Sequence, residues 1–127
     1  MSKKVLIVDD EPHIRMLLEQ TLDELEDEGV ALFTASNGQD ALAMVEEERP
    51  DLILLDVMMP YVNGFDVCRQ VKANPAYEGI FVMMLTAKGQ EFEREMGEDV
   101  GVDLYVTKPF DPDDVLEKAA EVLGIEL

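Results

Sequence analysis

Short apolar runs recur along the chain, and each is followed by apolar residues at helical spacing. A short apolar run that ends abruptly is typical of a strand buried on both faces, as in a parallel sheet. Spacings of three and four are typical of a helix with one buried face. The expected strands are residues 5–8, 30–35, 52–55, 80–85 and 103–107. Their alternation with helices predicts an α/β fold with a doubly wound, five-stranded parallel sheet between two helical layers.

Residues that favour the start or the end of a helix predict where the helices between the strands lie. One continuous first helix is expected from Pro12 to Gly29, with an inward face made of Ile14, Leu17, Leu18, Thr21, Leu22 and Leu25. Asn37-Gly38 predicts a turn. The other helices are expected within residues 39–49, 65–73, 90–100 and 112–123. The helix over 90–100 has the weakest pattern, because Gly97 interrupts it.

Polar residues follow four of the five expected strands. Asp9 and Asp10 come after the first strand, Asp56 after the third, Thr86 after the fourth and Lys108 after the fifth. In the flavodoxin-like strand order 2-1-3-4-5 the first and third strands are neighbours, and ligands bind at the carboxyl ends of the strands. The sequence therefore predicts that the three carboxylates converge in one cleft, flanked by Thr86 and Lys108.

Three clustered carboxylates need a cation or a shared proton, because their charges repel one another. Hard oxygen ligands with room for water suit Mg²⁺. Lys108 and the Thr86 hydroxyl could then hold the oxygens of a phosphoryl group, and a carboxylate such as Asp56 could be the nucleophile that forms an aspartyl-phosphate. Each residue alone has an ordinary explanation: a helix cap, a turn, an inert hydroxyl or a surface lysine. The combination at four strand ends favours the functional interpretation.

Length and charge set the remaining limits. The 127 residues predict one domain over 1–127, with no output domain. A formal net charge of -19 disfavours direct contact with nucleic acid or anionic membranes. The first apolar run, residues 5–8, is too short for a signal peptide or a membrane span. The single cysteine, Cys68, allows no internal disulfide. A cytoplasmic protein is expected.

The polar strand ends lie within motifs of a known family. The chain resembles the receiver domain of two-component response regulators, including the chemotaxis regulators, over nearly its full length. The motifs that carry this resemblance are Val8-Asp9-Asp10-Glu11-Pro12, Leu55-Asp56-Val57-Met58-Met59-Pro60, Asn63-Gly64, Leu85-Thr86-Ala87 and Lys108-Pro109-Phe110.

The resemblance implies a role for each site residue. Asp56 would accept a phosphoryl group from a histidine kinase or a histidine phosphotransfer protein, and Lys108 would bind that group. Asp10, Asp56 and the backbone carbonyl of Met58 would be Mg²⁺ ligands, with Asp9 acting mainly through water. Thr86 and Tyr105 would be the switch residues. The bond between Lys108 and its following proline is expected to be cis.

The family also implies how the signal leaves the domain. Its signalling face consists of the fourth helix, the fifth strand and the fifth helix, which would contact an unknown downstream protein. A homodimer through that face is one form of output that the resemblance allows. The expected fourth helix, over 90–100, is the element most suited to move.

Other functions fit the residues less well. An aspartyl phosphatase or phosphotransferase usually carries a second acid two residues after its nucleophile, where this chain has Met58. A receiver-like module that binds without phosphate would normally lack part of the acid cluster. A flavin-binding version of the fold would need a Ser/Thr/Gly-rich phosphate loop. His13 could be a metal ligand, but a surface position is the simpler interpretation, because metal sites need several converging ligands.

Overall fold

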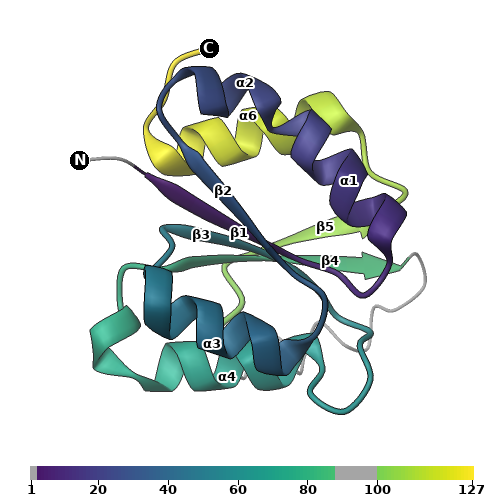
Figure 1. Cartoon of the computed structure of the whole chain (residues 1–127), viewed down its shortest axis with the longest axis vertical. Helices are drawn as coiled ribbons and strands as arrows, with labels where there is room; N and C mark the ends of the chain where they lie inside the picture. Colours follow the sequence, from purple (N-terminus) through teal and green to yellow (C-terminus); the bar gives the residue numbers. More distant parts are fainter. Residues whose placement is uncertain (1–2, 88–99) are drawn as a thin grey trace.

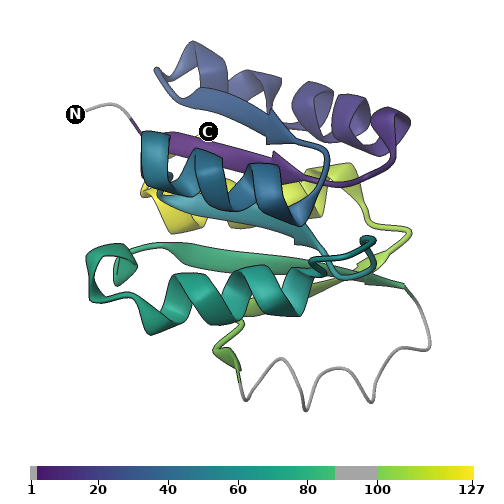
Figure 2. The same ribbon diagram turned by 60° about the horizontal axis from the view of Figure 1, so that its bottom comes forward.

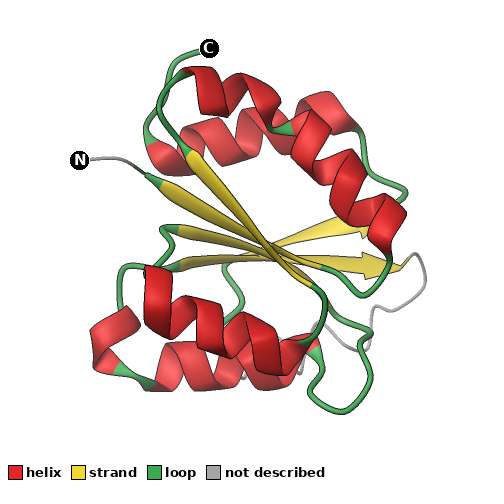
Figure 3. Cartoon of the chain, viewed as in Figure 1, coloured by secondary structure: helices red, strands yellow, loops and turns green. Residues whose placement is uncertain are grey.

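Five parallel strands form a single sheet in the order β2-β1-β3-β4-β5, as the sequence predicts (Figures 1 and 3). The computed structural model describes residues 3–87 and 100–127. The strands are β1 (Lys4–Val8), β2 (Ala31–Ala35), β3 (Leu52–Asp56), β4 (Phe81–Ala87) and β5 (Leu104–Lys108). All strand pairs are parallel, so the carboxyl ends of the strands lie along one edge of the sheet.

Helices cover both faces of this sheet and complete the expected three layers (Figure 1). The helices are α1 (Pro12–Thr21), α2 (Asp23–Asp27), α3 (Gly38–Glu48), α4 (Gly64–Ala73), the 3₁₀ turn η1 (Pro75–Tyr77) and α6 (Pro112–Leu123). Helices α1, α2 and α6 lie on one face, and α3 and α4 lie on the other; the turned view shows α3 and α4 in front of the sheet (Figure 2). The helix expected over 90–100 lies outside the described residues, apart from Val100.

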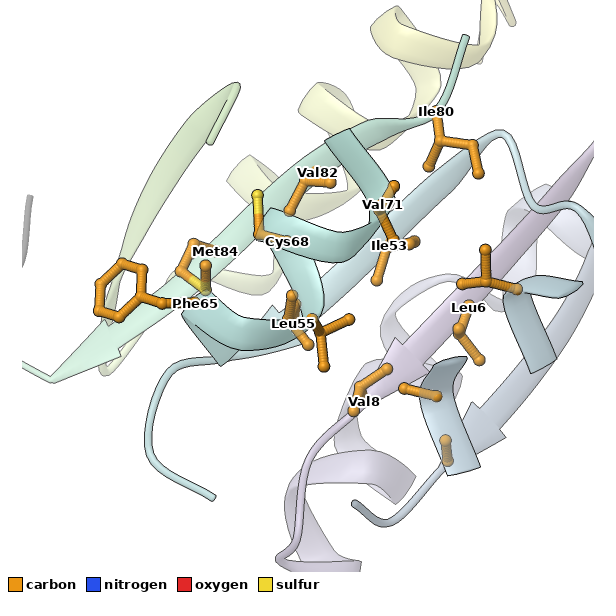
Figure 4. Close-up of a cluster of buried hydrophobic side chains, with 14 of the residues drawn as sticks. Leu6, Val8, Ile53, Leu55, Phe65, Cys68, Val71, Ile80, Val82 and Met84 are labelled. Atoms are coloured by element: carbon orange, nitrogen blue, oxygen red, sulfur yellow. The ribbon is translucent and has the colours of Figure 1, made fainter. Parts of the chain in front are cut away.

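Apolar side chains fill both spaces between sheet and helices. The strand at the centre, β3, is buried along its whole length, which explains its unbroken apolar sequence. Leu6, Val8, Ile53 and Leu55 face α3 and α4 in one cluster (Figure 4), while alternate residues of the same strands face α1 and α6 in another. Because successive strand residues point to opposite faces, each strand supplies both clusters.

Cys68 belongs to the cluster beneath α4 (Figure 4). The pKa of its thiol is raised to about 11, chiefly by burial; the positive charge of Lys72 lowers this pKa, and the negative charge of Asp103 raises it. Its Sγ donates a hydrogen bond to the Val100 carbonyl oxygen over 3.5 Å. A thiol with so high a pKa is protonated at neutral pH and packs as a small apolar group.

The expected single first helix is wrong, because it is two helices that meet at Leu22. Leu22 and Leu25 are both buried, so the apolar spacing continues across the break. The break places Asp23, Glu24 and Glu26 in the first turn of α2 instead of at the end of one long helix. Acidic residues are favourable at the positive start of a helix and unfavourable at its end. Leu17, expected on the inward face, is 39% exposed.

Asparagine side chains begin the two helices on the other face. Asn37 was expected in a turn, but it is the N-cap of α3 and accepts a hydrogen bond from the Asp40 N–H over 2.8 Å. Asn63 forms a reciprocal capping box with Asp66 at the start of α4. These caps fix the two helix starts at the carboxyl edge of the sheet, beside the loop that follows β3.

Candidate functional site

The three predicted carboxylates converge at the carboxyl edge of the sheet. Asp56 is the last residue of β3, and Asp9 follows β1 directly. These two strands are neighbours, with Val8 paired to Leu55. One carboxylate oxygen each from Asp9, Asp10 and Asp56 lies within 4.8 Å of the others. Asp9 is fully buried, Asp56 is 6% exposed and Asp10 is exposed, so the cluster opens to solvent on one side.

Lys108 joins this cluster from the edge strand β5. Its Nζ donates to Asp9 Oδ2 over 2.9 Å and to Asp56 Oδ1 over 3.2 Å. The peptide bond to Pro109 is cis, as the resemblance implies. The lysine supplies one positive charge against three carboxylates, which leaves the site with excess negative charge when all four groups are ionised.

The Asp56 carboxyl group has a strongly perturbed pKa. Burial, followed by the negative charge of Asp9, raises that pKa from the usual value of 3.8 to about 6. The charge and hydrogen bond of Lys108, and a hydrogen bond from the Met58 backbone N–H, act in the opposite direction but do not cancel it. The metal-free site therefore disfavours a second negative charge beside Asp9.

The pKa of the Lys108 ammonium group is also raised. Burial favours the neutral amine, but the Asp9 hydrogen bond and the charges of Asp56 and Asp9 outweigh it and raise the pKa of Lys108. The lysine is thus positively charged at neutral pH. A fixed cation that touches both buried carboxylates is placed to neutralise charge that develops beside Asp56.

Thr86 lies on β4, the strand next to β3, and Tyr105 lies on β5, the edge strand beyond it. Thr86 is 4% exposed and follows Leu85, the residue that pairs with Asp56. Tyr105 is half-buried, pairs with Met84 in the sheet and packs against the cluster beneath α4. Met58 is 59% exposed, and its backbone N–H donates a hydrogen bond to the Asp56 carboxylate.

The donor set fits a small divalent cation. All three side chains offer carboxylate oxygens, which Mg²⁺ prefers, and the exposed side of the cluster leaves room for the waters that Mg²⁺ retains. Both oxygens of Asp9 are engaged, one by Lys108 and the other by the Glu11 N–H at 2.9 Å. Asp10, which is exposed, and Asp56, which accepts from Lys108 at Oδ1 and from the Met58 N–H, could coordinate the cation directly.

His13 does not belong to the acid cluster formed by the described residues. Its Nε2 lies 3.2 Å from Glu11 Oε2, and its side chain is 74% exposed. This arrangement agrees with the interpretation of His13 as a surface residue.

Arg15 is a site contact that the sequence interpretation missed. Its Nη1 donates to the Asp9 carbonyl oxygen over 2.6 Å, from the first turns of α1. The available signal was a basic residue close behind the acid pair, near a helix start where the macrodipole disfavours positive charge.

The geometry agrees with comparisons to known proteins. Residues 5–120 match the family model described as the response regulator receiver domain. The chain is 44% identical to the alkaline phosphatase synthesis transcriptional regulatory protein PhoP of Bacillus subtilis, over 97% of this chain and 49% of that protein. The chain thus spans about half the length of such curated relatives.

Solved structures show the same fold along nearly their whole length. The chemotaxis response regulator CheY4 of Vibrio cholerae superposes with a TM-score of 0.83 at 34% identity, covering 96% of this chain and 99% of that one. The BeF3-activated DrrB receiver domain superposes with a TM-score of 0.84 at 31% identity, covering 98% and 99%. No helix in the described part of the chain is long and apolar enough to cross a membrane. The chain belongs to the response regulator receiver domain family.

Proposed function

We propose that this domain is a phosphorylation-activated switch in which Asp56 accepts a phosphoryl group in an Mg²⁺-dependent reaction. The observation that carries the proposal is the meeting of three carboxylates and one lysine around the buried end of β3. An Asp56 oxygen would form a bond to phosphorus while the bond from phosphorus to a donor imidazole nitrogen breaks, and the imidazole keeps the electron pair. The donor would be a histidine kinase or a histidine phosphotransfer protein.

Each neighbour of Asp56 has a distinct task in this proposal. Asp10, Asp56 and the Met58 carbonyl would hold Mg²⁺, and Asp9 would act mainly through water. When bound, the cation would supply positive charge for the phosphoryl oxygens. Lys108 would exchange part of its contact with Asp56 for a contact with the phosphoryl group, and Thr86 would donate a hydrogen bond from its hydroxyl.

The switch would follow from these new contacts. A phosphoryl group adds a charge of about -1.5 to -2 and strong acceptor oxygens. Thr86 would move toward those oxygens, and Tyr105, on the adjacent strand, would turn inward. We infer a change in the surface around β5 and α6 that a downstream protein, or a second copy of the domain, would recognise. The helix expected over 90–100 would share that surface but lies outside the described residues.

The charge of the chain supports a protein as the direct partner. A formal net charge of -19 repels nucleic acid and anionic membranes, which agrees with a signalling protein in the cytoplasm. Relatives such as PhoP are named transcriptional regulators, so we infer regulation as the role and no turnover of an external substrate. The apolar Met58 side chain cannot serve as the general acid of an aspartyl phosphatase.

Intact mass after incubation with acetyl phosphate tests the proposal. One phosphoryl adduct is expected with Mg²⁺ and none with a chelator. Asp56→Asn is expected to abolish the adduct. Asp23→Asn, at an exposed position on α2, is the matched control and is expected to retain it. An adduct on Asp56→Asn, or failure of the native chain to bind either BeF3⁻ or a phosphoryl group with Mg²⁺ present, would contradict the proposal.

A further inference from the structure

Every polar atom of Asp9 has a hydrogen-bonding partner. Its N–H donates to the Ala35 carbonyl oxygen over 3.3 Å, and its two carboxylate oxygens accept from the Glu11 N–H and from Lys108, each over 2.9 Å. The remaining atom, the backbone carbonyl oxygen, accepts from Arg15 over 2.6 Å. A hydrogen bond from a charged donor is about twice as strong as a neutral one.

The position of Arg15 in α1 calls for a compensating contact. The helix begins at Pro12, so Arg15 lies in its first turns, and the Arg15 N–H donates to the Glu11 carbonyl over 3.2 Å. The helix macrodipole disfavours a cation near the start of a helix. The guanidinium instead reaches back across the loop to the Asp9 carbonyl.

That carbonyl belongs to the peptide unit that joins Asp9 to Asp10. Because a peptide unit is planar, holding its oxygen also fixes the direction in which the chain enters Asp10. Asp10 is exposed, whereas Asp9 is completely buried, so the Asp9 side holds the peptide firmly and the Asp10 side is open to solvent. A tether on the shared peptide is therefore what can restrict the orientation of the Asp10 carboxylate toward Asp56.

We propose that Arg15 is a positioning residue of the cation site, which holds the Asp9–Asp10 peptide so that the Asp10 carboxylate faces Asp56 at the spacing that Mg²⁺ needs. The inference rests on the proposed function for its use of Mg²⁺ but concerns the binding step alone. Residues that orient metal ligands without touching the metal change metal affinity by about 10- to 100-fold when they are removed. Arg15→Ala is expected to weaken Mg²⁺ binding by about tenfold or more.

A purely electrostatic role for Arg15 predicts the opposite result. The guanidinium is a positive charge close to a cation site, so its removal would strengthen Mg²⁺ binding if charge were the main effect. Arg15→Lys keeps the charge and can place one N–H donor at the Asp9 carbonyl. It is therefore expected to restore most of the affinity that Arg15→Ala loses.

Isothermal titration calorimetry with MgCl₂ measures this affinity directly, without any phosphodonor. Arg69→Ala is the matched control, because Arg69 forms an exposed ion pair with Asp66 on α4, over the opposite face of the sheet. It is expected to bind Mg²⁺ like the native chain. Thermal unfolding in chelator shows whether each variant is folded at the titration temperature.

A second readout separates positioning from the chemistry at Asp56. With acetyl phosphate, Arg15→Ala is expected to need about tenfold more Mg²⁺ for half-maximal phosphorylation, while the rate at saturating Mg²⁺ stays near the native value. Native affinity in folded Arg15→Ala, tighter binding, or equal loss in Arg15→Ala and Arg15→Lys would overturn the role of Arg15. If the native chain itself neither binds Mg²⁺ nor takes up a phosphoryl group, the proposed function fails, and the inference fails with it.

Discussion

Asp56 destabilises the metal-free fold that positions it. The folded pKa of about 6 lies above the usual 3.8, so the folded state holds more protons than the unfolded state between these pH values. This carboxyl group therefore contributes less to stability as the pH rises from about 4 to about 6, and its ionisation has its full cost above that window. The difference in pKa corresponds to roughly 2–3 kcal/mol at neutral pH.

Asp56→Asn is expected to stabilise the protein in chelator for this reason. The gain in the free energy of unfolding should be about 1–3 kcal/mol at pH 7.5 and should become small at pH 4, where the native carboxyl group is already protonated. Urea unfolding at both pH values measures it. Glu19→Gln, an exposed position on α1, removes one negative charge elsewhere and controls for the general charge of the chain. An equal gain in both variants would show that global charge, and not burial beside Asp9, is responsible.

Side-chain chemistry at the strand ends was predictable, whereas contacts to the backbone were not. Asp9, Asp56 and Lys108 could be placed together because strand order decides which carboxyl ends are adjacent. The Arg15 contact joins a helix to a backbone carbonyl, and no spacing rule for side chains specifies such a pair. The backbone around Tyr61 was not predicted either. Tyr61 has a φ of 67°, and the Val62 N–H donates a hydrogen bond to the Pro60 carbonyl oxygen, which together define a γ-turn. This conformation is strained for a bulky residue.

At the scale of elements, α4 begins so close to β3 that its first residue must be glycine. A Cβ on Gly64 would collide with the Asp56 carbonyl oxygen and would lie 3.0 Å from Met84 Sδ. The Gly64 N–H also donates to the Val57 carbonyl over 3.0 Å, which ties the helix start to the loop that follows Asp56. A side chain at this position must therefore displace the backbone of Asp56 itself.

Gly64→Ala is accordingly expected to lower the free energy of unfolding by about 2 kcal/mol or more, as overpacked cores do. Helix propensity alone predicts a gain of about 1 kcal/mol, so the sign of the change identifies the clash. Gly79→Ala is the control, because a Cβ there meets nothing within 4 Å. Its effect should stay within about 0.5 kcal/mol. Chemical denaturation of both variants measures the contrast, and a stable Gly64→Ala would mean that the loop accommodates the methyl group.

Element types followed from the apolar pattern, but element ends depended on tertiary contacts. The spacing of Leu18, Leu22 and Leu25 is the same for one helix or for two that share a buried face, so the break could not be located from periodicity. Asn37 suits both a turn and a helix cap, and the cap forms because the Asp40 N–H lies within reach of its side chain. The buried strands were located closely, because an apolar run has few alternatives in a parallel sheet.

At the scale of the whole molecule, an excess of negative charge opposes the compact state. The formal net charge of -19 arises from 29 acidic and 10 basic residues, and part of it is concentrated in the carboxylate cluster at one edge of the sheet. Salt screens the exposed charges, whose interactions fall off over about 8–10 Å at ordinary ionic strength. Sodium chloride should therefore raise the melting temperature, but it acts on the whole surface and has no preferred site.

Magnesium is expected to stabilise the fold beyond this general screening. A ligand that binds only the native state adds RT ln(1 + [L]/Kd), which is about 2.7 kcal/mol at 100 times Kd. MgCl₂ should thus raise the melting temperature more than NaCl at the same ionic strength. The excess should disappear in Asp10→Asn/Asp56→Asn, because these are the two carboxylates that we propose coordinate the cation directly. Equal effects of the two salts on the native chain would mean that the negative charge of this domain acts only as a diffuse surface property, and the carboxylate cluster would then have no role in cation binding.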